Sequence, residues 1–181
     1  MTATFQIKST ALNLQFIQDL QEKYGDSELE IRVHNGQRTD ILSDKQFWKI
    51  ISLLDWTKTG ENEGIVAPVV THLSSLSPSF IYQFEDKLSE KLYQLDTRQH
   101  AAEFPTPFSV DDFLYSRCAV VANGEIAFQT VLNDPSQMPL HLDFEPLLYL
   151  ASDAYTLKTG KPFVYAPTFS IETYANKEAW L

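Results

Sequence analysis

The stretch FSVDDFLYSRCAVVANG, from Phe108 to Gly124, is the part of the chain on which the choice of fold depends most. Its apolar residues recur every three or four positions, which predicts a helix with one buried face. These residues are Val110, Phe113, Leu114, Cys118 and Val121. Arg117 stands in the middle of that face, and an arginine keeps its charge at any working pH. Burying such a charge alone is costly, so we expect another segment to supply Arg117 with a carboxylate or several carbonyl oxygens.

Two interpretations of Arg117 follow from this placement. In the first, the arginine is a structural clamp between helices, and its expected partners lie on the preceding long helix or just after it: Glu85, Asp86, Asp96 and Glu103. In the second, it lies in a charged pocket and holds an anionic group. Asp111 and Asp112 then join it as candidate catalytic residues, although acids in the first turn of a helix are also stabilised there by its positive end.

A second group of charged residues lies near the end of the preceding long helix. The sequence LDTRQHA brings Asp96, Arg98 and His100 close together, and with Arg117 they form the candidate ligand-binding set. Basic residues near the end of a helix also complement its negative terminus, which is the structural alternative for this group.

No metal site or cofactor motif stands out in the sequence. HLDFE places His141, Asp143 and Glu145 at alternate positions, which in a strand would line up a three-ligand metal site. The prolines on either side favour a loop instead, with Asp143 capping the next helix. The four histidines are scattered, and no glycine-rich phosphate loop is present. We therefore expect no metal and no cofactor.

Serine residues mark the expected starts of several helices after residue 41. Ser43 and Gln46 have the spacing of a capping box, in which each side chain bonds the other residue's backbone. Ser77 and Ser109 precede two further helical patterns and are the expected caps of those helices. Residues 41–181 are therefore predicted to form a mainly helical domain.

The C-terminal part of the sequence changes character after Gly160, which is expected to end the last clear helix. The following residues are rich in aromatic and β-branched side chains, and Phe169, Ile171 and Tyr174 indicate a short strand. Pro167 restricts that strand to an edge or a short piece.

The first forty residues have a different pattern. Residues 4–8 and 28–34 alternate as half-buried strands do, and between them apolar residues recur at helical spacing. We therefore predict an α+β, mostly α fold, in which residues 1–40 form a strand–helix–strand module packed on or appended to a helical bundle. Two strands and a helix leave open sides, which need the helical body, a partner or a second copy.

Charge and composition limit the classes of partner. The chain of 181 residues has 24 acidic and 14 basic side chains, a formal net charge of −10. Such a surface repels nucleic-acid phosphates and anionic lipids, so we expect neither nucleic acid nor a membrane as partner. A basic protein is favoured instead, although the charge also serves solubility. One cysteine fits a reducing compartment, and we expect a cytoplasmic location.

The helical part of the sequence resembles the bacterial domain-of-unknown-function 4240 family over roughly residues 44–160. The resemblance lies in the linked order of FWKIISLLDW, LSSLSPSFIYQFEDKLSEKLYQLD, SVDDFLYSRCAVVANGEIAFQTVLNDP and YLASDAYTLKTG. The positions that match are Phe47, Trp48, Phe84, Asp111, Asp112, Phe113, Arg117, Gly124, Asp134 and Pro135. Where the family commonly has Trp-Ala-Ala-Tyr, this chain has DTRQHAAEF. The resemblance implies a mainly helical fold and no established activity.

The N-terminal part is similar, over a shorter stretch, to the opening module of small bacterial antitoxin-like proteins, which serves assembly or partner binding. We therefore expect a non-catalytic interaction protein of the antitoxin or immunity type. It would bind a basic protein, or associate with itself through the N-terminal module. The alternative is a small enzyme or anionic-ligand-binding domain that uses Asp111, Asp112 and Arg117.

Overall fold

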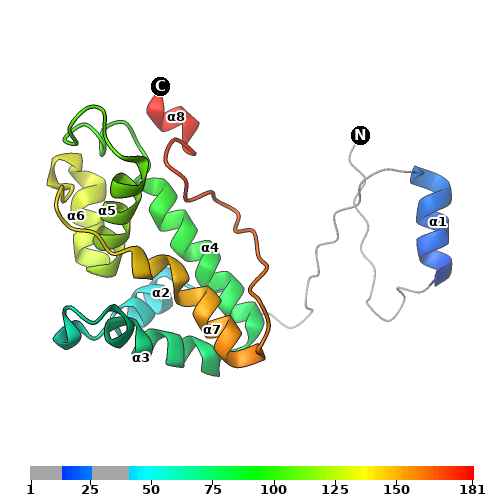
Figure 1. Cartoon of the computed structure of the whole chain (residues 1–181). Helices are drawn as coiled ribbons and strands as arrows, with labels where there is room; N and C mark the ends of the chain where they lie inside the picture. The colour runs from blue at the N-terminus through cyan, green and yellow to red at the C-terminus, as the bar shows by residue number, and fades with distance from the viewer. Residues whose placement is uncertain (1–13, 26–40) are drawn as a thin grey trace. The chain divides into compact units, whose positions relative to one another are not determined.

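The computed structural model describes residues 14–25 and 41–181, and the chain divides into two units, residues 1–39 and residues 40–181 (Figure 1). In the first unit the described residues form one helix, α1 (Leu14–Tyr24), which ends at Gly25 with a positive φ of 57°. The helix predicted at this place is therefore present. The strands predicted on either side of it lie outside the described residues.

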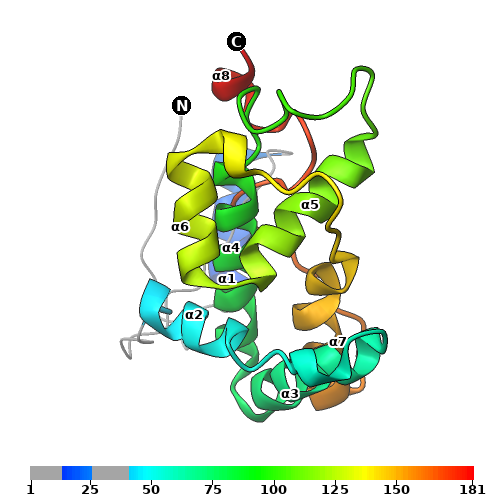
Figure 2. The same cartoon turned by 90° about the vertical axis from the view of Figure 1, so that its left-hand side faces the viewer.

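The second unit consists of helices joined by turns and loops (Figures 1 and 2). Its elements are α2 (Asp44–Ile51), η2 (Trp56–Lys58), α3 (Asn62–Ser75), α4 (Pro78–Gln94), α5 (Val110–Ala122), α6 (Glu125–Asn133), η3 (Pro135–Gln137), η4 (Glu145–Tyr149), α7 (Leu150–Thr159) and α8 (Lys177–Trp180), where η marks a 3-10 helix. Helices α3 and α7 pack side by side, and α4 lies against α5 and α7. No described helix has the length and apolar character needed to cross a bilayer.

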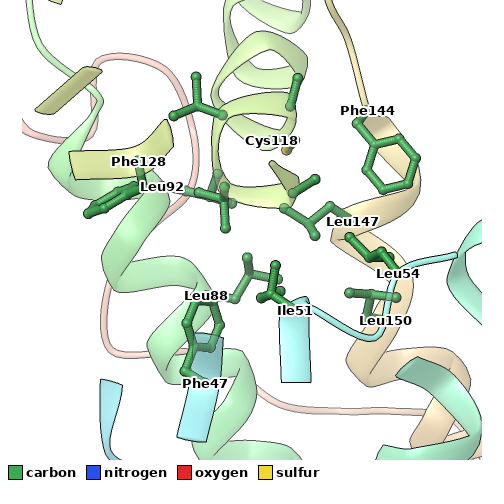
Figure 3. Packing of buried hydrophobic residues seen from close by; sticks show 14 of the residues in the cluster. Phe47, Ile51, Leu54, Leu88, Leu92, Cys118, Phe128, Phe144, Leu147 and Leu150 are labelled. Carbon is green, nitrogen blue, oxygen red and sulfur yellow. The ribbon is translucent and has the colours of Figure 1, made fainter. Parts of the chain in front are cut away.

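The core of this unit forms where α2, α4, α5, α6 and the η4–α7 region meet (Figure 3). Phe47 and Phe84 are fully buried with their ring centroids 5.4 Å apart, and Trp48 packs on Phe128 at 5.2 Å. Each fully buried side chain of this size contributes about 1.5–3 kcal/mol relative to an exposed one. The stripes of apolar residues on the helices are therefore what holds the bundle together.

The helices α2, α4 and α5 begin at the capping residues that the sequence predicted. Ser43 and Gln46 form the predicted capping box at α2. Ser77 accepts a hydrogen bond from a backbone N–H in the first turn of α4, and Ser109 does so at α5. Gly160 ends α7 with a left-handed φ of 67°, which glycine adopts without steric cost. These cap predictions are confirmed.

The predicted α+β class is wrong for the part of the chain that the structure describes. Residues 14–25 and 41–181 contain helices and no strand, so no strand–helix–strand module is observed around α1. A strand needs a neighbouring strand to bond its backbone. The described part provides helices, whose backbone groups are already paired within each helix.

The strand predicted near Phe169, Ile171 and Tyr174 is also absent. Residues 161–181, which we call the C-terminal segment, instead run along α4 in an extended form as far as a turn at residues 173–174, and end in α8 (Figure 1). The alternation is real, since side chains from Phe163 to Thr173 are in turn partly buried and exposed. However, the backbone of the segment bonds to side chains of the helices, so no β ladder forms.

The last long helix also begins later than predicted. Asp143 does not cap it, because η4 comes first and α7 starts only at Leu150. Pro146 lies in the first turn of η4, where its missing N–H costs nothing.

Candidate functional site

Arg117 on α5 is fully buried, with an exposed fraction of 0%. Its Nη1 donates to the Leu92 carbonyl oxygen of α4 at 2.9 Å. Its Nη2 donates to the Ile171 carbonyl oxygen at 3.0 Å and to the Thr173 hydroxyl oxygen at 3.1 Å. The guanidinium group therefore joins α5, α4 and the C-terminal segment through neutral oxygens.

The charge of Arg117 has no direct ion pair in the described chain. Burial lowers its pKa, and the negative charge of Asp96 opposes that shift. The ring of Phe113 lies below the guanidinium carbon, 4.9 Å from it, which adds a cation–π contact. Only Nε has no hydrogen-bond partner. Carbonyl oxygens, an aromatic face and the more distant carboxylates of Asp96 and Glu172 thus compensate the charge.

Asp96 follows α4 and is also fully buried. Its carboxylate accepts hydrogen bonds from the backbone N–H groups of Tyr174 and Asn176, at 3.1 and 2.9 Å, and from the indole N–H of Trp180 at 3.0 Å. Tyr174 has a positive φ of 72°, a conformation in which successive N–H groups can turn toward one anion. The end of the C-terminal segment is therefore wrapped around the Asp96 carboxylate.

Asp86, further toward the start of α4, holds the first half of the C-terminal segment in a similar way. Its carboxylate accepts a hydrogen bond from the Tyr165 hydroxyl at 2.6 Å and one from the Thr168 backbone N–H at 2.9 Å. The rings of Tyr82 and Tyr165 stack with centroids 4.7 Å apart. Asp86 of α4 and Asp96, just after that helix, thus hold the two halves of the segment.

The other candidate catalytic residues lie apart from these groups. Asp111 and Asp112 are exposed in the first turn of α5, where the helix terminus favours negative charge. Arg117 is on the same helix but inside the core. The structure therefore does not bring the three side chains to one open surface, and a catalytic role for them stays a prediction.

The remaining members of the candidate ligand-binding set are also separated. Arg98 is exposed, and its backbone N–H donates to the Ala179 carbonyl oxygen. His100 is buried, and its ring nitrogens bond the Thr97 hydroxyl at 2.7 Å and the Val131 carbonyl oxygen at 3.1 Å. Burial lowers the pKa of His100, so its ring is neutral near pH 7. Within this set the charge of Arg117 acts on both Asp96 and His100, whereas Arg98 is exposed.

A surface pocket that the sequence did not indicate opens between α3, η4 and α7. It has a volume of about 290 Å³ and is lined by Asn62, Glu63, Val66, Asp143, Glu145, Pro146, Tyr149 and Asp153. We call it the acidic pocket, because four of these residues are carboxylic acids and none is basic. Glu145 accepts a hydrogen bond from the Tyr149 hydroxyl at 2.8 Å. Within the described ranges no ion pair involves any of the four acids.

The acidic pocket was missed because its residues come from distant parts of the chain. The sequence pattern marks Asp143 and Glu145 as metal-ligand candidates and Asp143 as a helix cap, and Glu63 and Asp153 give no local signal. In residues 14–25 and 41–181, no group of three or more histidine, cysteine or acidic side chains is arranged to hold a metal ion.

Comparison with known proteins places the helical unit in a family. The model of the family described as "Protein of unknown function (DUF4240)" matches residues 42–157, more than half of the chain, so the protein belongs to this family. The resemblance predicted from the sequence is thereby confirmed. No curated protein and no solved structure matches the chain. The similarity of the N-terminal part to antitoxin-like modules stays a prediction.

Proposed function

We propose that the helical unit is a non-catalytic binding domain that takes a basic segment of a partner protein in the acidic pocket. The observation that carries this proposal is the gathering of four carboxylic acids around one hollow without a basic residue among them. Lysine and arginine side chains of a partner would supply the missing positive charge. The overall charge of −10 would steer such a partner toward the surface.

The pocket also offers contacts for the apolar part of a lysine or arginine side chain. Val66, Pro146 and Tyr149 line it, and Tyr149 is 49% exposed. Long basic side chains bury their methylene groups on such surfaces while their charged ends reach a carboxylate. This combination favours a protein segment over a simple cation.

The particular type that we propose is an antitoxin- or immunity-like protein of the bacterial cytoplasm, which neutralises a basic partner by covering it. The cytoplasmic location rests on the single cysteine, Cys118, which is buried and whose pKa burial raises to about 12. Such a thiol is inert and needs no disulfide partner. We also propose, from the sequence, that two copies of the chain can associate through the N-terminal module.

No observation favours the enzyme alternative to the same degree. Arg117 has no surface on which a substrate could reach it, and its donors Nη1 and Nη2 are taken by protein oxygens. Asp111 and Asp112 are exposed in the first turn of α5, away from the buried guanidinium of Arg117. We therefore do not propose a reaction.

The test uses a fluorescent peptide of alternating lysine and glycine as a probe and measures its affinity by anisotropy. A triple variant, Glu63→Gln, Asp143→Asn and Asp153→Asn, removes three charges from the acidic pocket. We expect it to weaken binding by about tenfold or more, which corresponds to at least about 1.4 kcal/mol.

A matched control separates the pocket from the overall charge. Asp111→Asn, Asp112→Asn and Glu125→Gln remove the same number of charges from exposed positions on α5 and α6. We expect this control to bind within about threefold of the wild type, because these acids do not line the pocket and the charges of exposed side chains are screened by salt. Equal loss in both variants, or no loss in either, would overturn the proposal.

A further inference from the structure

Close to Tyr165 of the C-terminal segment, α4 carries one acidic group with a buried oxygen atom that accepts no hydrogen bond. Glu85 is next to Asp86 on α4 and is partly buried. Its Oε2 atom is fully buried and has no hydrogen-bond partner. Asp86, by contrast, uses both of its oxygens to hold Tyr165 and Thr168 of the segment.

The groups around Glu85 do not offset a negative charge. On α4 its charged neighbour is Asp86, which has the same sign, and the phenol of Tyr82 is nearby on the same helix. The C-terminal segment adds the Tyr165 hydroxyl, and α7 adds Tyr155, which contacts Tyr82. In the described chain no lysine, arginine or histidine forms an ion pair with Glu85.

We propose that the C-terminal segment is a latch whose first half, around Tyr165 and Thr168, loosens from α4 when Glu85 ionises. With Glu85 protonated, one neutral acid lies under the segment beside the Asp86 carboxylate. With Glu85 ionised, two adjacent negative charges share a poorly hydrated site, and one of them lacks a donor. Lifting the first half of the segment admits water to Glu85 and so removes the free-energy cost of its unpaired, poorly hydrated charge. This inference does not depend on the acidic pocket.

The change falls in the physiological range of pH. Burial, aided by the charge of Asp86, raises the pKa of Glu85 from 4.5 to about 7. An acid whose pKa is higher in the docked than in the free state favours docking when protonated. The contribution of protonated Glu85 to the stability of docking is fully present below pH 4.5, declines as the pH rises, and is lost above about pH 7. Docking of the first half should therefore weaken toward alkaline pH.

The second half of the segment provides an internal reference. Tyr174 and Asn176 donate their backbone N–H groups to Asp96, which lies further along the chain from Glu85 and close to Arg117. Ionisation of Glu85 does not act directly on these bonds. The latch should consequently open at one end and remain attached at the other.

The experiment follows amide hydrogen exchange by NMR at individual residues of the full chain, with rates corrected for the intrinsic effect of pH. Between about pH 6 and about pH 8, the protection of the Thr168 amide should fall by up to about tenfold, the change that linkage to this pKa shift allows. The amides of Tyr174 and Asn176 should keep their protection within about twofold over the same range.

Glu85→Gln keeps the shape of the side chain and removes its charge change, so the Thr168 amide should lose its pH response in this variant. Glu90→Gln, on the same helix but paired with Lys87, is the matched control and should respond as the wild type does. An unchanged Thr168 amide in the wild type, or the same response in Glu85→Gln, would overturn the latch. An equal response of the Tyr174 and Thr168 amides would also overturn it. Both of these outcomes are measured on the wild-type protein, so neither depends on the folding of a variant.

Discussion

Two groups of acidic side chains in the helical unit differ in what surrounds them. Asp86 and Asp96 on the α4 side accept hydrogen bonds from five donors of the C-terminal segment. In the acidic pocket, Glu63, Asp143 and Asp153 are exposed, and within the described chain no hydrogen bond or ion pair engages their side chains. Carboxylates thus hold the C-terminal segment in one region, and remain exposed and available to a partner in the other.

The difference shows how to separate structural from binding acids. A buried carboxylate costs several kcal/mol unless donors surround it, so Asp96 must be matched by its own chain. An exposed carboxylate remains hydrated and costs little, so a protein can keep it for a partner. The comparison predicts large stability effects on the α4 side and small ones at the acidic pocket.

The largest effect is expected for Arg117→Met. The variant leaves the Leu92 and Ile171 carbonyl oxygens without their donor and removes the positive charge that acts on Asp96. A hydrogen bond of a charged group contributes about 1.5–3 kcal/mol, so the loss of several should cost about 3–5 kcal/mol. Urea unfolding followed by circular dichroism would measure the change in the free energy of unfolding.

Arg98→Met is the control for Arg117→Met, because its side chain is exposed and no hydrogen bond or ion pair fixes it in the described chain. It should change the free energy of unfolding by no more than about 0.5 kcal/mol. If the two variants had the same stability, Arg117 would not be a clamp.

The next effect is expected for Asp96→Asn. Its carboxylate has donors on both oxygens, whereas an asparagine offers one oxygen and turns an N–H₂ group toward the remaining donors. Loss of hydrogen bonds to a charged acceptor costs about 1.5–3 kcal/mol. The same unfolding measurement applies, with the exposed Asp111→Asn as control. A cost below that of the control would show that Asp96 does not hold the segment.

The sequence predicted the features of this structure that depend on neighbouring residues. The caps at Ser43, Ser77 and Ser109 each involve a bond to a residue three positions later. The burial of Arg117 was predictable for a similar reason, because the surrounding apolar residues recur on one face of its own helix.

The partners of Arg117 were not predictable in the same way. The sequence left two kinds of partner open, a carboxylate or several carbonyl oxygens, and its named candidates were acids. The structure supplies the carbonyl oxygens of Leu92 and Ile171. Every residue has a carbonyl oxygen, so the sequence does not reveal which one will be used. The same limit explains the strand wrongly predicted near Phe169: an extended segment can bond a neighbouring strand or the side chains of a helix, and only the fold decides.

The smallest effect is expected at the acidic pocket, in the double variant Glu63→Gln and Asp153→Asn. Both acids lie in the first turn of a helix, α3 and α7, and each gains about 0.3–1 kcal/mol from the helix terminus. Against this, both line one pocket with two further acids, so neutralising them relieves repulsion. These two opposing effects should leave the free energy of unfolding within about 0.5 kcal/mol of the wild type. Added salt should make the difference smaller still, because it screens both the helix-terminus interaction and the repulsion among the acids. A loss comparable to that of Asp96→Asn would mean that the pocket acids are structural, and the contrast between the two regions would disappear.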